Sequence, residues 1–436
     1  MRPGRLARLG GIAATLGVAS CVENLTAPGK CPEFCPSGSI RIVDTLLTMN
    51  VSRDSAYRGY VLAHEPAALA VVDAPGVMDS RAIMVTGALA DAVVLAGDTV
   101  TDRIVGSDSL KLTLTLTRRD TGAQNLTLRF YRLPVNLDST TTFANVAGAF
   151  ATAPLRTVNL DSLEAKATRD TATGNFVFVD PATGDAIAVD TATDRVALTV
   201  KFDSLQAPYS AADSGRLGIG LRVAAGGPTS VAIATRASVV GGARVSWYAT
   251  VDSITDSSTT RIHKLPPFPR GVEFESFVFD PPPAPLDSTL AVGGAPSARS
   301  LLRVDLPRAI RDSSQIVRAT LILVPAVAAR GAPADSFIVE AHTVLTDFGA
   351  KSPIALDPQR TDTAMIRIGA TDSVRIEVTN LLRLWAVDTI LPTAIMLRAQ
   401  DEGSNPAEIR FYPSAAQPYR PSLRVTFARR FPFGVP

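Results

Sequence analysis

Residues 110–116 read Leu-Lys-Leu-Thr-Leu-Thr-Leu, in which apolar and polar side chains alternate without a break. A two-residue period places the leucines on one face of a β-strand and the lysine and threonines on the other, so that one face is buried and the other meets solvent. The same alternation occurs in both halves of the chain, at 126–130, 196–202, 217–223, 374–378, 408–412 and 423–427. The sequence therefore predicts antiparallel strands throughout.

Turn-forming residues separate these strands, as in DTGAQN at 120–125, DPATGD at 180–185 and DEGSNP at 401–406. Helical patterns are short, and only 307–312 and 380–387 favour helices. Many short strands joined by such turns are typical of β-sandwiches and jelly rolls. The predicted fold class is all-β, with two tandem jelly-roll-like β-sandwich domains.

A chain of 436 residues suits two domains. Prolines gather in LPPFP at 265–269 and DPPPAP at 280–285, and proline cannot donate a hydrogen bond to a central sheet. Between them, VEFESFVF at 272–279 is expected to form one strand. The predicted domains are a first sandwich at 40–253, a proline-rich linker at 254–285, a second sandwich at 286–428 and a tail at 429–436. The stretches 196–251 and 374–427 share one order of strands and turns, which favours two related domains.

The chain begins MRPGRLARLGGIAATLGVASC, with three arginines before a short apolar run. The run is too short to span a bilayer, which takes about 20 residues, and its layout is that of a secretory signal at 1–20. Val-Ala-Ser-Cys at 18–21 resembles the bacterial lipobox. That resemblance implies that Cys21 carries the lipid and, with Val22 rather than aspartate after it, that the protein is anchored to the outer membrane, on either side. The alternative is an ordinary signal followed by a chance cysteine.

Cys31 and Cys35 lie in CPEFCP, within a tether at 21–39. With Cys21 lipidated, an even pair remains in an exported protein, which favours a disulfide. Free thiols and a metal site are the alternatives, although zinc takes four ligands and no further cysteine exists.

The charge of the chain is nearly balanced, with 43 basic and 41 acidic residues and a net charge of +2. Proteins that bind nucleic acid concentrate positive charge on one face, and no such concentration is visible here. No second apolar stretch is long enough to cross a membrane. The expected contact with the membrane is therefore through the lipid anchor alone, and no nucleic-acid partner is expected.

Aspartate precedes serine or threonine at many loop entries, for example at Asp138, Asp161 and Asp203. Short Asp, Ser and Thr side chains bind nearby backbone amides in turns. Calcium ligation is the alternative, but no stretch carries the dense ligand series of a calcium loop. We expect turns and no cofactor, with one or two structural calcium ions as the alternative.

Six short motifs of the second half appear in the order of a known family. They are SLLRVDL at 300–306, VRATLIL at 317–323, VTNLLRLW at 378–385, IMLR at 395–398, FYPS at 411–414 and RPSLRVTF at 420–427. In this order they resemble the disaggregatase-related (DNRLRE) domains over 286–428. The chain departs from the family at Thr393-Ala394, where the family often has glycine. The resemblance implies a jelly-roll-like sandwich of secreted and cell-surface proteins, some of which are attached to polysaccharide-active enzymes and some of which bind carbohydrate.

Aromatic side chains that stack on sugar rings are the first residues to seek in such a module. Trp247 and Tyr248 form one candidate ligand platform, and Tyr412 and Tyr419 flank a loop that could form another. Trp385 follows three leucines and is expected to fill a core instead.

No catalytic motif is visible. The three histidines, His64, His263 and His342, stand in unrelated contexts, and the chain has no Gly-x-Ser-x-Gly elbow, H-E-x-x-H or P-loop. We therefore expect a lipid-anchored, non-catalytic envelope protein that binds polysaccharide. The first alternative is a structural or partner-binding envelope lipoprotein without a glycan ligand. The second is a polysaccharide hydrolase whose two carboxylates meet only in the fold.

Overall fold

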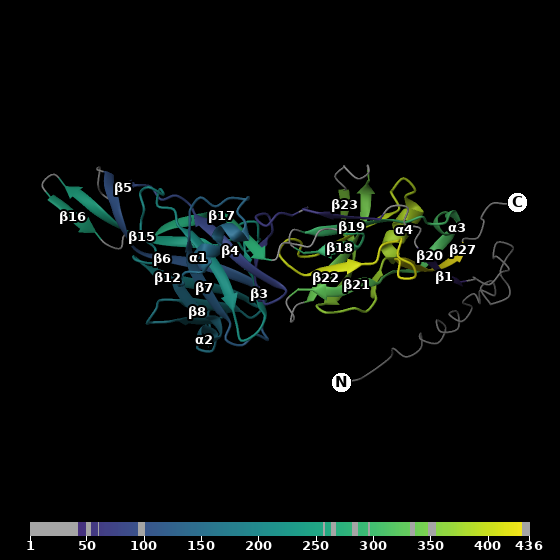
Figure 1. The fold of residues 1–436 in the computed structure, drawn as a ribbon, viewed down its shortest axis with the longest axis horizontal. Helices are drawn as coiled ribbons and strands as arrows, with labels where there is room; N and C mark the ends of the chain where they lie inside the picture. Colours follow the sequence, from purple (N-terminus) through teal and green to yellow (C-terminus); the bar gives the residue numbers. More distant parts are fainter. Residues whose placement is uncertain are drawn as a thin grey trace, which may run out of the picture.

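The computed structural model of the chain describes residues 42–48, 54–59, 61–94, 101–255, 258–262, 267–280, 287–294, 297–331, 336–347 and 355–429. The fold is all-β, as predicted, with a few short helices. The strands form two units that follow one another end to end along the long axis of the molecule (Figure 1). None of the helices in the described ranges is both long enough and apolar enough to cross a membrane.

The first unit, here called the barrel unit, holds one sheet and two helices. Its strands are β3 (Ala68–Ala74), β4 (Met78–Thr86), β5 (Ala92–Val94), β6 (Thr101–Arg119), β7 (Thr127–Leu133), β8 (Arg156–Asn159), β9 (Thr168–Arg169), β10 (Phe176–Val179), β11 (Ala186–Asp190), β12 (Arg195–Asp203), β13 (Gly218–Ala224), β14 (Thr229–Ala234), β15 (Arg244–Thr255), β16 (Ser258–Ile262) and β17 (Phe268–Asp280). Its helices are α1 (Phe143–Phe150) and α2 (Leu160–Glu164).

Six strands of this unit pair in a closed ring, in the order β6-β14-β3-β4-β17-β15 and back to β6. The ring closes because β6 is long: its residues 103–113 pair with β15, and its residues 116–119 pair with β14. Closure leaves no free sheet edge within the ring. Strand pairing in this unit thus gives a barrel-like closure and does not confirm the predicted jelly-roll-like sandwich. The sequence could not predict the closure, because it does not show that the two ends of one long strand pair with different strands.

The core of the ring contains the stretch that predicted the strands. Leu110, Leu112, Leu114 and Leu116 are all buried in the largest apolar cluster of the barrel unit. Lys111, between two of these leucines, is partly exposed on the opposite face of β6. The alternation at 110–116 thus sets which face of β6 is buried, as predicted.

The second unit, here called the sandwich unit, consists of two facing sheets. Its strands are β1 (Ile42–Thr48), β2 (Ser55–Arg58), β18 (Leu290–Gly293), β19 (Ala298–Arg303), β20 (Ser314–Leu323), β21 (Pro325–Arg330), β22 (Ser336–Thr346), β23 (Ala355–Arg367), β24 (Val374–Glu377), β25 (Ala394–Ala399), β26 (Glu408–Phe411) and β27 (Ser422–Arg429). Its helices are α3 (Arg308–Arg311) and α4 (Thr379–Val387), close to the two predicted helices. One sheet has the order β1-β27-β20-β24, and the remaining strands form an eight-stranded sheet. Trp385 lies fully buried in the core between the sheets, as expected.

The strand pairs differ from the predicted domain boundaries at two places. β1 pairs with β27 and β2 pairs with β19, so both early strands belong to the sandwich unit and not to the unit that follows them in the chain. β17, which includes 272–279, pairs with β4 and β15 in the barrel unit. The chain therefore passes through the sandwich unit first, builds the barrel unit, and then returns.

Aspartates close the turns as expected. Asp138 Oδ1 accepts the backbone N–H of Thr140, and Asp203 Oδ1 accepts those of Leu205 and Gln206. The related segments DTATGN at 170–175, DPATGD at 180–185 and DTATDR at 190–195 join β9 through β12 and use the same bond. These bonds favour the charged carboxylate and hold the pKa of Asp170 and Asp180 below the ordinary value. Within the described ranges no three His, Cys, Asp or Glu side chains are grouped so that they could hold a metal ion.

Candidate functional site

Trp247 and Tyr248 do not form an exposed aromatic platform. The indole of Trp247 is 0% exposed, and its Nε1 donates a hydrogen bond to Ser107 Oγ at 3.0 Å inside the barrel unit. Tyr248 points to the other face of β15, where it is half-buried and Lys111 Nζ lies 5.7 Å from its ring centroid. A ring that solvent does not reach cannot stack on a sugar from solution, so Trp247 is a core residue.

Tyr412 and Tyr419, by contrast, lie together. Their ring centroids are 5.0 Å apart with an interplanar angle of 25°, which is a stacked pair. Tyr419 is 50% exposed, and the backbone N–H of Tyr412 donates to Val324 O, which fixes the loop against the end of β20. We call these two residues the tyrosine pair. Of the aromatic candidates in the sequence, they alone offer a stacked and exposed surface.

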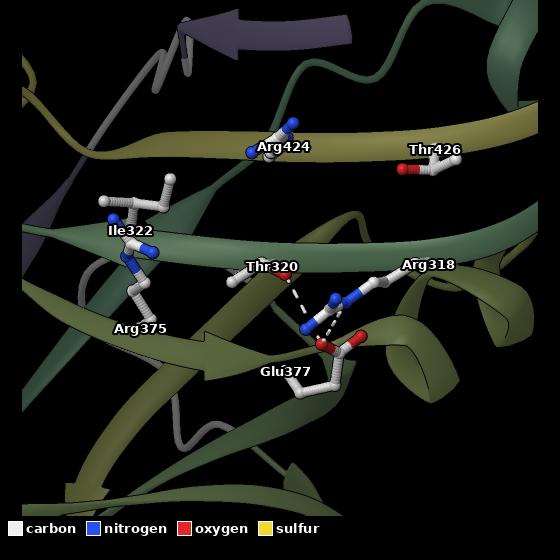
Figure 2. A pocket seen from close by; sticks show the side chains of 7 residues that line it. All are labelled: Arg318, Thr320, Ile322, Arg375, Glu377, Arg424 and Thr426. Carbon is white, nitrogen blue, oxygen red and sulfur yellow. Dashed lines mark hydrogen bonds and ion pairs between the residues drawn. The ribbon is translucent and has the colours of Figure 1, made fainter. Parts of the chain in front are cut away.

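A hollow of about 390 Å³ lies on the outer face of the four-stranded sheet (Figure 2). It is lined by Arg318, Thr320, Ile322, Arg375, Glu377, Arg424 and Thr426. These residues alternate along β20, β24 and β27, and the strand register aligns them in rows, with Thr320 opposite both Arg424 and Glu377, and Ile322 opposite Arg375. We call this hollow the sheet groove.

Two of the three arginines in the sheet groove are neutralised by diagonal ion pairs. Arg318 Nε lies 3.0 Å from Glu377 Oε2, and Arg424 Nη2 lies 2.6 Å from Asp44 Oδ2 on β1. The hydrogen bond from Arg424 holds the pKa of Asp44 below its ordinary value. Partial burial raises the pKa of Glu377, but hydrogen bonds from Thr379 and Arg318 outweigh burial and leave that pKa lowered. Both carboxylates are therefore charged at neutral pH.

Arg375 differs from the other two arginines. It lies beside Ile322 with no dashed contact, whereas Arg318 and Thr320 both reach Glu377 (Figure 2). In the part of the chain that the structure describes, no carboxylate forms an ion pair with Arg375, and the side chain is exposed. The sheet groove thus has one positive charge more than its internal partners cancel.

The tyrosine pair lies at the same end of the sheet as Arg375. Ser422, the first residue of β27, is opposite Ile322, which in turn is opposite Arg375. The loop that carries the tyrosine pair leads directly into Ser422, and it is bonded to Val324, two residues beyond Ile322. Arg375, which has no ion pair in the described part of the chain, and an exposed aromatic stack therefore lie toward the same end of the four-stranded sheet, although the tyrosines are not among the residues that line the groove.

The tyrosine pair was predicted from the sequence as a candidate site, whereas the sheet groove was not. The residues that form the groove do follow a pattern in the sequence. Polar residues alternate with core residues in three strands, as Arg-x-Thr at 318–320, Arg-x-Glu at 375–377 and Arg-x-Thr at 424–426. That pattern says that arginines face outward from each strand. It does not say that the three strands are neighbours, since strand order depends on pairing between residues that are distant in the sequence, such as Thr320 with Glu377 and with Arg424.

Of the three histidines, His342 lies in a buried polar cluster. His342 is buried on β22, with Nε2 2.8 Å from Glu340 Oε2 and Nδ1 facing the carbonyl of Asp357. Arg398 Nε also donates to Glu340, at 2.9 Å. This is a satisfied buried polar cluster with no open position for a substrate. His263 lies outside the described residues, as do Cys21, Cys31 and Cys35.

Two carboxylates near the groove have pKa values displaced in opposite directions. Burial raises the pKa of Asp362 on β23, and the negative charge of Glu377 raises it further. Glu377 itself is held in its charged form. Such divergence is a feature of acid–base pairs, but Asp362 is not among the residues that line the sheet groove.

Comparison of the chain with models of known protein families and with curated proteins found no match. The resemblance at 286–428 therefore rests on the motifs alone.

Proposed function

We propose that this chain is a lipid-anchored envelope protein that binds an acidic polysaccharide through the sheet groove and the tyrosine pair. The observation that carries the proposal is an arginine-lined hollow on a sheet that has an exposed aromatic stack toward one of its ends. The lipobox-like start of the chain supports export and anchoring at Cys21. The resemblance of 286–428 to the disaggregatase-related domains supports a glycan as the ligand class.

The chemistry of the groove favours a negatively charged sugar over a neutral one. Arginine presents a planar fork of donors that fits a carboxylate or a sulfate in a bidentate manner. Arg375 has no ion pair of its own in the described part of the chain, so an anionic ligand can bind it without displacing an internal partner. The tyrosine pair adds an apolar face for a sugar ring.

The first experiment is a binding panel. The processed chain, residues 21–436 with Cys21→Ser to prevent acylation, is titrated with acidic and neutral polysaccharides, with and without calcium. We expect saturable binding to one or more acidic polysaccharides that weakens as salt is added, because salt screens exposed charges. Binding to neutral polysaccharides alone would contradict the proposed chemistry. Absence of binding to every polysaccharide in the panel would favour a structural or partner-binding role.

Removing the exposed ring of the tyrosine pair should weaken binding. Tyr419→Ala is expected to lower affinity for the acidic polysaccharide by about fivefold, the equivalent of about 1 kcal/mol of aromatic contact. Tyr419→Phe keeps the ring and should bind like the wild type. Isothermal titration of the two variants separates the stacking contribution from any effect of the hydroxyl. Equal affinity of the wild type, Tyr419→Ala and Tyr419→Phe would show that the tyrosine pair is not part of the binding site.

Asp44 competes with the ligand for Arg424, because its carboxylate lies 2.6 Å from that guanidinium. Asp44→Asn is therefore expected to tighten binding of the acidic polysaccharide by about twofold to fivefold, in keeping with the small size of exposed ion pairs. The same titration measures it. Asp312→Asn removes an exposed carboxylate outside the groove and should leave affinity unchanged, whereas weaker binding by Asp44→Asn would contradict the competition.

A polysaccharide hydrolase is the second candidate, and the divergent pKa values of Asp362 and Glu377 are the observation in its favour. The polysaccharides that bind can be incubated with the protein and examined for new reducing ends. Turnover that Glu377→Gln and Asp362→Asn each abolish would identify these two carboxylates as catalytic.

A further inference from the structure

Exposed aliphatic side chains gather at the end of the sandwich unit that lies farthest from the barrel unit. Val387, the last residue of α4, is 81% exposed, and Ile390, three residues later, is 92% exposed. Val317, at an irregularity in β20, is also exposed. In a monomeric protein, side chains this exposed are ordinary when single, but a group of them marks a contact surface.

Hydrogen bonds hold the segments that carry these residues next to one another. Arg383 of α4 donates to the carbonyls of Ile316 and Val317, at 3.0 and 3.1 Å, so α4 runs beside the start of β20. Arg311 of α3 donates to the carbonyl of Thr389, next to Ile390. Asp388 Oδ1 accepts the N–H of Ile390 at 3.0 Å, which fixes the turn that exposes Ile390. We call Val317, Val387, Ile390 and the surrounding arginines the end patch.

The charges around these aliphatic residues are mostly positive. Among the described residues, four arginines lie here: Arg308 and Arg311 of α3, Arg383 of α4, and Arg429, which is opposite Ser314 at the start of β20. Two carboxylates contact the same segments, Asp312, 4.0 Å from Arg311, and Asp388. Aliphatic side chains ringed by arginines suit the headgroup region of a bilayer, where phosphates meet acyl chains.

The predicted anchor leads to this same end. β1 begins at Ile42, which is opposite Ala428, and Ala428 is also opposite Gln315 at the start of β20. Figure 1 draws β1, β20, β27 and α3 together at the end of the molecule away from the barrel unit. From Cys21 to Ile42 the chain can reach at most about 70 Å. A lipid on Cys21 would therefore tether the end of the sandwich unit that carries the end patch within about 70 Å of the membrane surface.

We propose that the end patch docks on the lipid surface, with Val387 and Ile390 in the headgroup region and the arginines beside the lipid phosphates. The anchor supplies attachment, and the end patch supplies orientation. Docking in this way directs the barrel unit away from the bilayer and leaves the outer face of the four-stranded sheet open from the side. The inference goes beyond polysaccharide binding and uses none of the residues of the sheet groove.

The test uses the processed chain with Cys21→Ser, so that no acyl chain contributes. Vesicles of phosphatidylethanolamine and phosphatidylglycerol are sedimented with the wild type, with Val387→Asp/Ile390→Asp, and with Leu205→Asp/Val239→Asp. The last is a matched control, since Leu205 and Val239 are 88% and 98% exposed but lie in the barrel unit. Because all four side chains are exposed, every variant should keep the thermal unfolding midpoint of the wild type.

We expect the wild type and the control to bind the anionic vesicles, and the Val387→Asp/Ile390→Asp protein to bind them at least tenfold more weakly. The wild type should bind vesicles of phosphatidylcholine alone more weakly than the anionic vesicles. Absence of vesicle binding by the wild type would overturn the inference. Equal binding by all three proteins would also overturn it. A wild-type dimer that the end-patch variant dissociates, without vesicle binding, would assign the end patch to a second copy of the chain.

Discussion

Arg375→Ala is expected to weaken binding of an acidic polysaccharide by about tenfold to a hundredfold. A hydrogen bond to a charged group contributes about 1.5–3 kcal/mol, and each 1.4 kcal/mol is about a factor of ten in affinity. Arg375 is the arginine of the sheet groove for which the described part of the chain provides no ion pair, so its full donor capacity is available to a ligand. Isothermal titration against the polysaccharide selected from the panel measures the effect.

Two companion variants make this result specific. Arg375→Lys keeps the charge but loses the planar fork, so it should recover only part of the affinity. Arg169→Ala removes an exposed arginine of β9 in the barrel unit and should bind like the wild type. If Arg375→Ala binds as tightly as Arg169→Ala, the sheet groove is not the binding site.

Trp247→Ala is expected to lower the free energy of unfolding by about 3–5 kcal/mol, the usual range for removing a large buried aromatic ring. The indole is fully buried in the core of the barrel unit, so its removal takes a large apolar group out of a packed cluster and leaves a cavity. Trp247→Phe keeps most of the volume but leaves Ser107 Oγ without its donor, which should cost about 1–3 kcal/mol. Chemical denaturation followed by circular dichroism measures both changes.

The same variants test the assignment of Trp247 to the core. At temperatures where Trp247→Phe remains folded, its affinity for the polysaccharide should equal that of the wild type, because the binding residues lie in the other unit. Loss of affinity in a fully folded Trp247→Phe protein would indicate that the polysaccharide binds in the barrel unit, at Trp247. A change in unfolding free energy below 1 kcal/mol for Trp247→Ala would contradict the buried position.

The sequence predicted local structure well because local patterns reflect burial directly. The alternating leucines at 110–116 are buried as expected, and the apolar spacing at 380–387 corresponds to α4. The orientation of Trp247 was open, since Val245 and Trp247 share one face and the sequence does not say whether that face is inside. Trp247 is buried because β15 belongs to the closed ring of strands, which encloses that face.

What the sequence could not provide was pairing between distant segments. β1 and β27 are adjacent although more than 370 residues separate them, and this pairing brings Asp44 to Arg424. The sheet groove exists only because β20, β24 and β27 are neighbours. Tyr412 and Tyr419 could be named as candidates because both flank one loop, whereas the arginines could not, since each looked like an ordinary solvated residue of its own strand.

The most direct test of polysaccharide recognition compares one polymer in two forms. The processed chain with Cys21→Ser is titrated with an acidic polysaccharide from the panel and with the same polysaccharide after its carboxyl groups have been reduced to alcohols. The arginine-lined groove predicts saturable binding to the acidic form and at least tenfold weaker binding to the reduced form, with Arg375→Ala weak toward both. Equal binding of the two forms would contradict recognition of negative charge in the sheet groove.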